Sequence, residues 1–271
     1  MKLIESKVEV IEQQPGLDGV YKQIELAGRT CYKSEDKITE DSAKSFVDRM
    51  IGSKHGAMLE HGTVYLSVPK EETEIIGFHG WCQYSKVRSD LVMEEPCNWL
   101  ITTNMRVLVE HDRLRDLKYI CEPTERHEKR ITARFTCDRG VSHEIVRHRV
   151  MSFAQESQRY VGYDKEKFGG EVTFVKPHWY DEEFPACLTW IESLKESEKK
   201  YLELREAGLK PQDARGVLPN ATKTEIVVTG FESDWEHFFS LRSPKYGAQG
   251  VHPDMAKLAD ELYEKLNSVN K

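Results

Sequence analysis

The sequence predicts an α+β fold, a single domain in which a β-sheet is flanked by helices. Short runs that alternate apolar and polar residues are typical of half-buried strands, and they are interspersed with segments whose apolar residues recur at helical spacing. A length of 271 residues with 39% hydrophobic residues is enough for one large domain or two small ones. Because no internal repeat or low-complexity segment is found, one domain is the simplest account.

The N-terminal part of the chain is predicted to contain two strands and two helices. KVEVIEQ (7–13) is the first strand, and GVYKQIELAGRTCY (19–32) is a helix that runs into a turn. A second helix is predicted within residues 39–56, with Thr39 as its N-cap. TVYLSV (63–68) alternates as a strand does.

The pattern is harder to interpret from about residue 70 to residue 130. ITTNMRVLVEHDRL (101–114) fits a helix, whereas the charged CEPTERHEKR (121–130) is typical of an exposed connection. We interpret about 70–130 as a long insertion into the domain.

Regular elements return at ITARFTC (131–137), an alternating strand. Asp138 follows as an N-cap, and RGVSHEIV (139–146) is a short helix that ends at Arg147. Farther on, Ser233 and Glu236 have the spacing of a capping box. The remaining predicted elements are helices at 184–208, 233–242 and 254–266, a short helix from Pro211 to Pro219, and a strand at 222–231.

The charge balance argues against binding to polyanions. Counting 39 Lys and Arg against 46 Asp and Glu gives a formal charge of −7, so we expect neither nucleic acid nor an anionic membrane as a partner. No stretch approaches the roughly 20 apolar residues of a membrane span, and the N-terminal segment lacks the apolar core of a signal peptide. We therefore expect a cytoplasmic protein.

Cysteine spacing and motif searches exclude several common kinds of site. The six cysteines form no CxxC pair, which argues against a zinc module and a disulfide framework, so we expect mostly reduced core thiols. GxGxxG, GxxxxGK[ST], HExxH and GxSxG are all absent. No metal site is expected. Surface or core roles are favoured over ligation for the histidines outside any pattern: His55, His79, His111, His127 and His252.

One stretch, VRHRVMSFAQESQRYV (146–161), concentrates basic side chains within this acidic chain. Arg147, Arg149 and Arg159 offer planar guanidinium groups suited to phosphate or carboxylate. In the alternative interpretation they complement a helix dipole and pair with Glu144 and Glu156. The residue types alone favour neither interpretation.

The spacing of the whole motif decides between the anion-binding and the helix-dipole interpretation. Arg147, His148 and Arg149 are followed by seven residues, then Ser157 and, two further on, Arg159, and this pattern resembles the signature of flavin-dependent thymidylate synthases. Other stretches resemble the same family in the same order: LEHGT (59–63), AGRTCY (27–32), ARGVLP (214–219) and HFFSLR (237–242). The resemblance covers the chain except for about 70–130.

The resemblance implies a fold, a reaction and an assembly. The family fold is a β-sheet flanked by helices, assembled as a homotetramer with active sites between subunits. The reaction converts dUMP to dTMP, with methylenetetrahydrofolate as one-carbon donor and NADPH as reductant through bound FAD, and releases tetrahydrofolate. We therefore expect residues 1–271 to form one catalytic domain.

The resemblance also assigns roles to individual residues. Arg242 is expected to polarise the uracil ring, and Glu144 lies where the family more often has Gln. The residues expected to bind dUMP are Glu144, Arg147, Gln155, Glu156, Ser157, Gln158, Arg159, Arg215 and Arg242. Those expected to bind FAD are His61, Thr63, Arg147, His148, Arg149, Gln155, Phe231, Glu232, Ser233 and His237.

Two other functions remain possible from the sequence. A non-catalytic module for RNA or nucleotides would use the arginines as phosphate clamps, and the acidic balance counts against it. A cysteine-dependent thymidylate synthase would need an activated thiolate. Its best candidate, Cys97, follows two glutamates that would raise its pKa.

Overall fold

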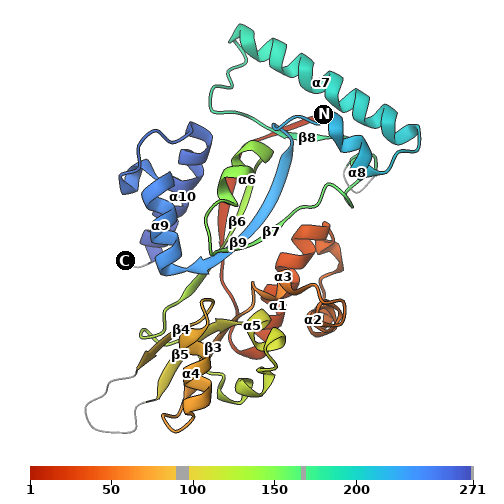
Figure 1. The fold of residues 1–271 in the computed structure, drawn as a ribbon. Coiled ribbons are helices and arrows are strands. Elements are labelled where there is room, and N and C mark those ends of the chain that lie inside the picture. The colour runs from red at the N-terminus through yellow and green to blue at the C-terminus, as the bar shows by residue number, and fades with distance from the viewer. Residues whose placement is uncertain (90–97, 166–168, 270–271) are drawn as a thin grey trace.

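A four-stranded antiparallel sheet forms the centre of the protein (Figure 1). The computed structural model describes residues 1–89, 98–165 and 169–269. The strand order is β2 (Lys7–Ile11), β6 (Arg130–Asp138), β9 (Lys223–Phe231) and β7 (Ser152–Gln155). The strands predicted at 7–13, 131–137 and 222–231 are confirmed, whereas β7 was not predicted.

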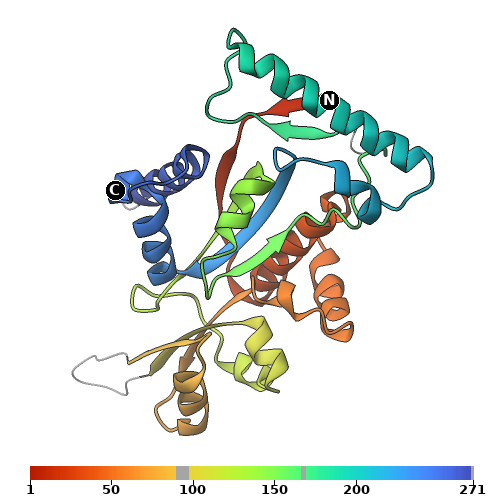
Figure 2. The same cartoon turned by 45° about the horizontal axis from the view of Figure 1, so that its top comes forward.

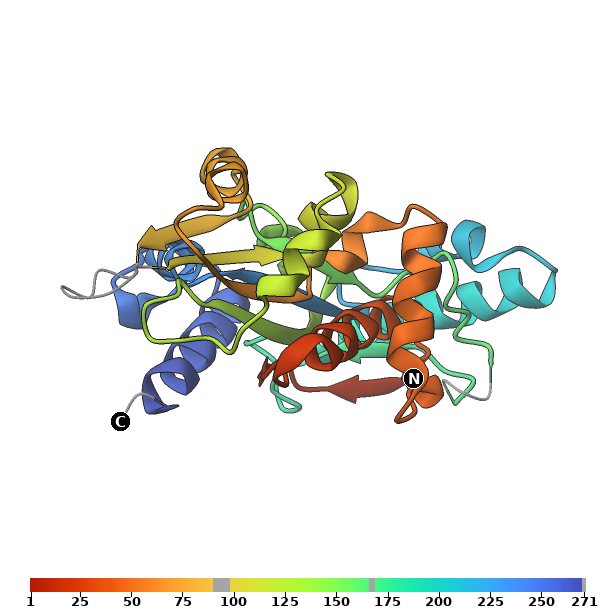
Figure 3. The same cartoon turned by 90° about the horizontal axis from the view of Figure 1, so that it is seen from below.

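Helices cover both faces of this sheet (Figures 1 and 3). Side chains alternate along β9, so Ile226 and Val228 join one core cluster and Val227 joins another. The first cluster is closed by α6 (Arg139–Ile145), α9 (Glu232–Arg242) and α10 (Pro253–Val269). On the opposite face lies α1 (Gly16–Tyr32). The mixed α and β architecture with a sheet between helices is therefore as predicted.

The helix α1 packs against α2 (Ser42–Gly52) and α3 (Gly56–Leu59). Gly28 allows the close approach, because a Cβ there would lie 2.4 Å from Cζ of Phe46. The N-cap of α2 is Asp41, so the prediction of Thr39 is wrong. Between α1 and α2 lies the 3-10 turn η1 (Glu35–Lys37).

A second sheet, in the order β3-β5-β4, is built mainly from residues 70–130. Its antiparallel strands are β3 (Thr63–Val68), β5 (Trp99–Asn104) and β4 (Lys86–Ser89). Around it lie α4 (Thr73–Trp81), α5 (Met105–Glu110) and the 3-10 helix η2 (Leu114–Tyr119). Ile101 and Leu108 share a core cluster with α1, so this segment is integrated into the fold.

The helix predicted at 101–114 is only partly correct. Residues up to Asn104 belong to β5, and the helix α5 starts at Met105, where the Asn104 side chain accepts a hydrogen bond from the Val107 N–H at 3.1 Å. Residues 121–129 contain neither helix nor strand, as predicted for a connection.

The long helix α7 (Pro185–Glu206) runs beside a small parallel sheet (Figure 2). This sheet pairs β1 (Lys2–Ile4) with β8 (Thr173–Val175). The connection to β9 holds α8 (Pro211–Ala214) and η4 (Arg215–Val217), and η5 (Pro244–Tyr246) precedes α10. Only Cys187, Leu194 and Tyr201 of α7 are buried.

Of the three predicted helix N-caps, only the one at Asp138 is confirmed. The Asp138 side chain accepts a hydrogen bond from the Val141 N–H at 2.8 Å and caps α6, as predicted. The capping box predicted at Ser233 and Glu236 is wrong, because α9 already begins at Glu232. Instead, the carboxylate of Asp234 accepts from the Phe231 N–H at 2.9 Å.

All five cysteines that the structure describes are free thiols. Within the described ranges, no helix has both the length and the apolar character needed to cross a membrane.

Candidate functional site

The Arg-His-Arg motif follows directly after α6. A hydrogen bond from the His148 N–H to the Ile145 carbonyl (3.3 Å) and one from the Met151 N–H to the His148 carbonyl (3.3 Å) hold this segment in turns. As a result, His148 points inward and is buried, while Arg147 and Arg149 are exposed.

His148 is neutral in this environment. Its Nε2 lies 3.3 Å from Arg242 Nε, which can only donate, so Nε2 accepts. Nδ1 therefore carries the proton and donates to the Ile145 carbonyl at 2.9 Å. Burial lowers the pKa of His148, and the Arg242 charge lowers it further. Phe238 packs against the imidazole ring at a centroid distance of 4.8 Å.

Arg242, at the end of α9, is fixed by two residues of the motif region. Its Nη1 lies 2.5 Å from Glu144 Oε2, and its Nε donates to His148. This pairing neutralises the Glu144 carboxylate. It also brings together two residues, Glu144 and Arg242, that lie 98 positions apart in sequence.

The motif arginines have no such partners. Glu156, the other carboxylate considered for them, pairs instead with Lys223 at 2.9 Å. Within the described residues, no ion pair is formed by any of four exposed arginines: Arg147, Arg149, Arg159 and Arg215. Their guanidinium groups are available to an external anion.

Two of these arginines line a hollow of about 760 Å³. Arg147 and Arg149 form one side of it, and Tyr84 and Phe153 contribute aromatic side chains. Since Tyr84 precedes β4, the segment 70–130 supplies part of the wall. Such a volume is in the usual range for small-molecule sites.

The loop after β7 is held by the protein core. The Gln155 amide donates to Ser142 Oγ at 2.8 Å, and the Ser157 N–H donates to the Cys31 carbonyl at the end of α1 (3.0 Å). Ser157 Oγ accepts from the Arg159 N–H at 3.4 Å. Gln158 is buried, whereas the Arg159 side chain lies over the exposed Tyr160 ring.

The loop is also anchored through charge. Glu156 is buried against Lys223, which also pairs with Glu225. Although burial opposes it, the ammonium groups of Lys223 and Lys33 lower the pKa of Glu225 to about 2. Glu156 is therefore occupied by a structural ion pair. Arg215 lies on η4, after α8, and is exposed.

Other predicted flavin residues lie elsewhere in this single chain. His61 is fully buried, with Nδ1 2.8 Å from Thr229 Oγ1, and burial together with Arg130 lowers its pKa to about 3. Thr63 and Glu232 line a second hollow of about 460 Å³.

The rest of this group lies along the end of β9 and on α9. Phe231 is buried, and Ser233 donates to Glu128 Oε1 at 2.6 Å. His237 is exposed on α9 and lies close enough to His148 to influence its charge. The structure thus joins Glu144, His148 and Arg242 directly. Four of the predicted flavin residues line hollows, two in each of the two hollows.

Arg130 is a residue of this region that the sequence did not indicate. Its side chain is half-buried beside the smaller hollow and forms no ion pair with the described residues, and its guanidinium donates to the Glu60 carbonyl (2.9 Å) and to Ser152 Oγ (3.3 Å). Burial lowers its pKa to about 10. A lone arginine at the start of a strand carries no local pattern, so only the tertiary structure reveals it.

The described cysteines do not favour a thiolate mechanism. Burial raises the pKa of Cys31 to about 11 and also raises the pKa values of Cys121 and Cys137. The candidate Cys97 lies outside the described residues.

Comparisons with known proteins match this chain to one family. A family model described as "Thymidylate synthase complementing protein" matches residues 125–269. A flavin-dependent thymidylate synthase of Pyrococcus furiosus is 39% identical over 129 residues, which are 48% of this chain and 52% of that protein. Another flavin-dependent thymidylate synthase, of Mycobacterium tuberculosis, is 35% identical over 140 residues. The match covers 48% of this chain and 54% of that protein.

The chain spans about half the length of the curated relatives that it matches. Among solved structures, a UMP/dUMP methylase PolB from Streptomyces cacaoi bound with 5-Br dUMP aligns with a TM-score of 0.48 and 16% identity. The alignment covers 99% of this chain and 93% of that one, a similarity too low to establish a shared fold.

Proposed function

Because the chain belongs to the thymidylate synthase complementing protein family, we propose that it is a flavin-dependent thymidylate synthase. It would convert dUMP to dTMP, with methylenetetrahydrofolate as one-carbon donor and NADPH as reductant through bound FAD, and release tetrahydrofolate. Residues 1–271 would act as one catalytic domain, with about 70–130 as an insertion relative to shorter members. We place the enzyme in the cytoplasm.

The observation that carries this proposal is the set of unpaired arginines. Arg147, Arg149, Arg159 and Arg215 are exposed and free of ion pairs with the described residues, in a chain with a formal charge of −7. Phosphate groups match the guanidinium fork, and both a nucleotide monophosphate and a flavin dinucleotide supply them.

The donors around the larger hollow fit a flavin. Arg147 and Arg149 would hold the diphosphate, and Tyr84 and Phe153 offer aromatic surface to planar rings. Bound FAD would supply hydride-transfer chemistry that no amino-acid side chain offers. The remaining flavin assignments, to His61, Thr63, His148, Gln155, Phe231, Glu232, Ser233 and His237, stay predictions.

The loop after β7 would bind dUMP. Arg159 and Ser157 would bind the phosphate together with Arg215. Gln158, a residue of the same loop, would also contact the nucleotide. Glu156 would act by anchoring the loop through Lys223. The Arg242 guanidinium, held by Glu144 and His148, would stabilise negative charge as it develops on the uracil ring.

We also propose that the enzyme is a homotetramer with sites shared between chains. Support comes from the start of α7, where the N-cap residue Phe184 and Leu188 are 50% and 62% exposed. Apolar side chains exposed together are typical of a surface that another chain covers.

The direct test uses the purified protein. The preparation should be yellow, and denaturation should release FAD, identified by chromatography. Incubation with dUMP, methylenetetrahydrofolate and NADPH should form dTMP, with no product when NADPH is omitted. A preparation that neither retains added FAD nor forms dTMP would refute the proposal.

A further inference from the structure

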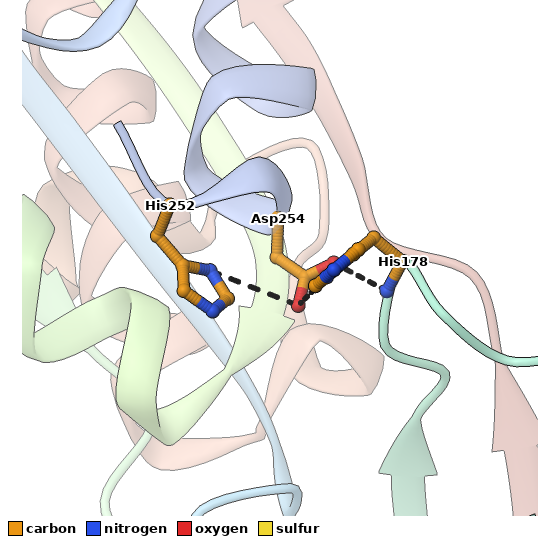
Figure 4. Close-up of side chains that lie close together, drawn as sticks. All are labelled: His178, His252 and Asp254. Carbon is orange, nitrogen blue, oxygen red and sulfur yellow. Dashed lines mark hydrogen bonds and ion pairs between the residues drawn. The ribbon is translucent and has the colours of Figure 1, made fainter. Parts of the chain in front are cut away.

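Three potential metal ligands meet at the start of α10, away from the proposed active site (Figure 4). Asp254 Oδ2 lies 3.4 Å from His178 Nδ1 and 3.9 Å from His252 Nδ1. One ligand atom from each of the three side chains falls within 4.8 Å of the others. Within the described residues, this is the one group of three or more His, Cys, Asp or Glu side chains with such spacing.

The backbone holds these residues in place. The His252 carbonyl accepts hydrogen bonds from the N–H groups of Met255 and Ala256, so His252 and Asp254 share the rigid first turn of α10. His178 follows β8 in a turn closed by the Tyr180 N–H and the Pro177 carbonyl at 3.0 Å. The cluster therefore joins two separate elements.

The Asp254 carboxylate is already oriented. Its Oδ1 accepts a hydrogen bond from the His178 backbone N–H at 2.6 Å, which leaves Oδ2 directed between the two imidazoles. Hydrogen bonds to the second oxygen of a ligating carboxylate are typical of metal sites, where they fix the ligand's orientation.

The separations are close to those around a tetrahedral ion. Zinc binds imidazole nitrogen at about 2.0–2.1 Å and carboxylate oxygen at about 2.0–2.2 Å, so neighbouring ligands lie about 3.4 Å apart. The Asp254–His178 distance already has this value, the Asp254–His252 distance exceeds it by about half an ångström, and the two imidazoles offer nitrogens within 4.8 Å of each other, so rotation of the exposed His252 side chain would close the site. We propose that His178, His252 and Asp254 bind one divalent transition-metal ion, with zinc as the best match, and that solvent completes the coordination.

The local charge favours a cation. Asp138, the N-cap of α6, is a second carboxylate close to Asp254. The ion would offset the repulsion between the two carboxylates. Because the imidazoles of His178 and His252 are exposed, an ion could reach the site from solvent.

The ion would also strengthen the junction between β8 and α10. In its absence, this junction includes ion pairs from Glu5 to Lys176 (3.8 Å) and to Lys257 (3.2 Å). Glu5 is 64% exposed, and such surface pairs contribute little. Because the site lies at the opposite end of α6 from Arg147, its role would be structural and separate from the proposed reaction.

The test is a Co²⁺ titration of the metal-stripped full chain without a polyhistidine tag. Tetrahedral Co²⁺ absorbs strongly in the visible region, so the parent should show one saturable site per chain, and Zn²⁺ should displace the signal. The variants His178→Ala, His252→Ala and Asp254→Asn should each bind at least about tenfold more weakly. Asp254→Asn retains an acceptor for the His178 N–H, which separates loss of the ligand from loss of the fold.

A matched control is His111→Ala, which removes another exposed histidine and should leave Co²⁺ binding unchanged. Zn²⁺ should raise the Tm of the parent and of this control, and it should raise the Tm of the ligand variants less. Stoichiometric Co²⁺ binding that survives all three ligand substitutions would overturn the proposal. Equally, binding to the parent only at millimolar metal would show that the cluster is not a built site.

Discussion

At the residue scale, Arg242 is the side chain whose role is most sharply defined by its contacts. Arg242→Ala removes the guanidinium that would stabilise charge on the uracil ring, so dTMP formation should be lost. Reduction of FAD by NADPH should remain largely intact, because that step does not involve the uracil. The two steps are measured separately, by flavin bleaching and by chromatography of dTMP.

The control for this experiment is Ser157→Ala. No His–Asp pair accompanies Ser157 in the sequence to activate it as a nucleophile, and in the structure its hydroxyl accepts from the Arg159 N–H. The Ser157→Ala variant should therefore bind dUMP more weakly and retain turnover. An inactive Ser157→Ala at saturating dUMP, together with an active Arg242→Ala, would reverse the two roles.

Arg159 tests phosphate recognition. Arg159→Lys keeps the charge but loses the bidentate fork, so dUMP affinity should fall by about 1–3 kcal/mol. Deoxyuridine, which has no phosphate, should bind both proteins alike. Calorimetric titration with the two ligands makes the comparison, and equal dUMP affinities would show that Arg159 does not contact the phosphate.

His61 should make the stability of the protein sensitive to acid. Burial and the neighbouring Arg130 lower its pKa from the ordinary 6.5 to about 3 in the folded protein. Between these values the unfolded chain binds a proton that the folded chain excludes. The free energy of unfolding should therefore fall as the pH falls from 6.5 towards 3, by up to about 1.4 kcal/mol per pH unit from this group.

Urea unfolding of the parent and of His61→Asn at several pH values between 4.5 and 6.5 measures this dependence. The variant should be less stable at pH 7 but should show a shallower slope of stability against pH. Parallel slopes in the two proteins would mean that His61 is protonated equally in the folded and unfolded chains.

Which residues the sequence could indicate depends on how local their pattern is. Arg147 to Arg159 form one contiguous motif, so their spacing was informative before the structure. The pairing of Glu144 with Arg242 was not predicted, since no local rule links α6 to the end of α9. Arg130 and Tyr84 were not indicated, because burial and lining of a hollow are properties of the assembled fold.

At the scale of elements, the contact between α1 and α2 depends on Gly28. A Cβ at this position would lie 2.4 Å from Cζ and 2.7 Å from Cε1 of the buried Phe46. Gly28→Ala should therefore destabilise the protein by about 1–3 kcal/mol despite the better helix propensity of alanine. The matched control is Gly77→Ala in α4, where nothing lies within 4 Å of the added methyl group.

In that control, alanine should be neutral or stabilising by up to about 1 kcal/mol. Both variants are compared with the parent by urea unfolding. Equal stability of Gly28→Ala and the parent would show that Phe46 can move aside and that the contact is loosely packed.

Elements were predictable where one periodicity dominates. Residues 131–137 and 63–68 alternate cleanly and are strands, and the apolar positions Met255, Leu258 and Leu262 are completely buried on α10. Residues 101–104, Ile-Thr-Thr-Asn, are different, because a segment this short shows no clear periodicity of its own. Pairing with β3 decides it, and that pairing is a tertiary property.

At the scale of the whole molecule, the predicted flavin residues are not gathered in one place within a chain. Arg147 and Arg149 line the hollow of about 760 Å³, whereas Thr63 and Glu232 line the one of about 460 Å³. A homotetramer in which the larger hollow of one chain meets the smaller hollow of its neighbour would reunite them. We therefore expect FAD binding to depend on assembly, and closed assemblies of this kind use repeated, symmetric contacts.

The exposed apolar side chains of α7 offer a way to test this dependence. Leu188 is 62% exposed, so Leu188→Glu adds charge to the proposed contact surface without disturbing the core. Light scattering should show a tetramer for the parent and smaller species for this variant, and FAD occupancy should fall in parallel. Lys195→Glu, an exposed position on the same helix, introduces the same side chain and should leave both assembly and flavin unchanged. A monomeric Leu188→Glu protein that still binds FAD fully and forms dTMP would show that each chain carries a complete site, and the division of the flavin residues between two hollows would then need another explanation.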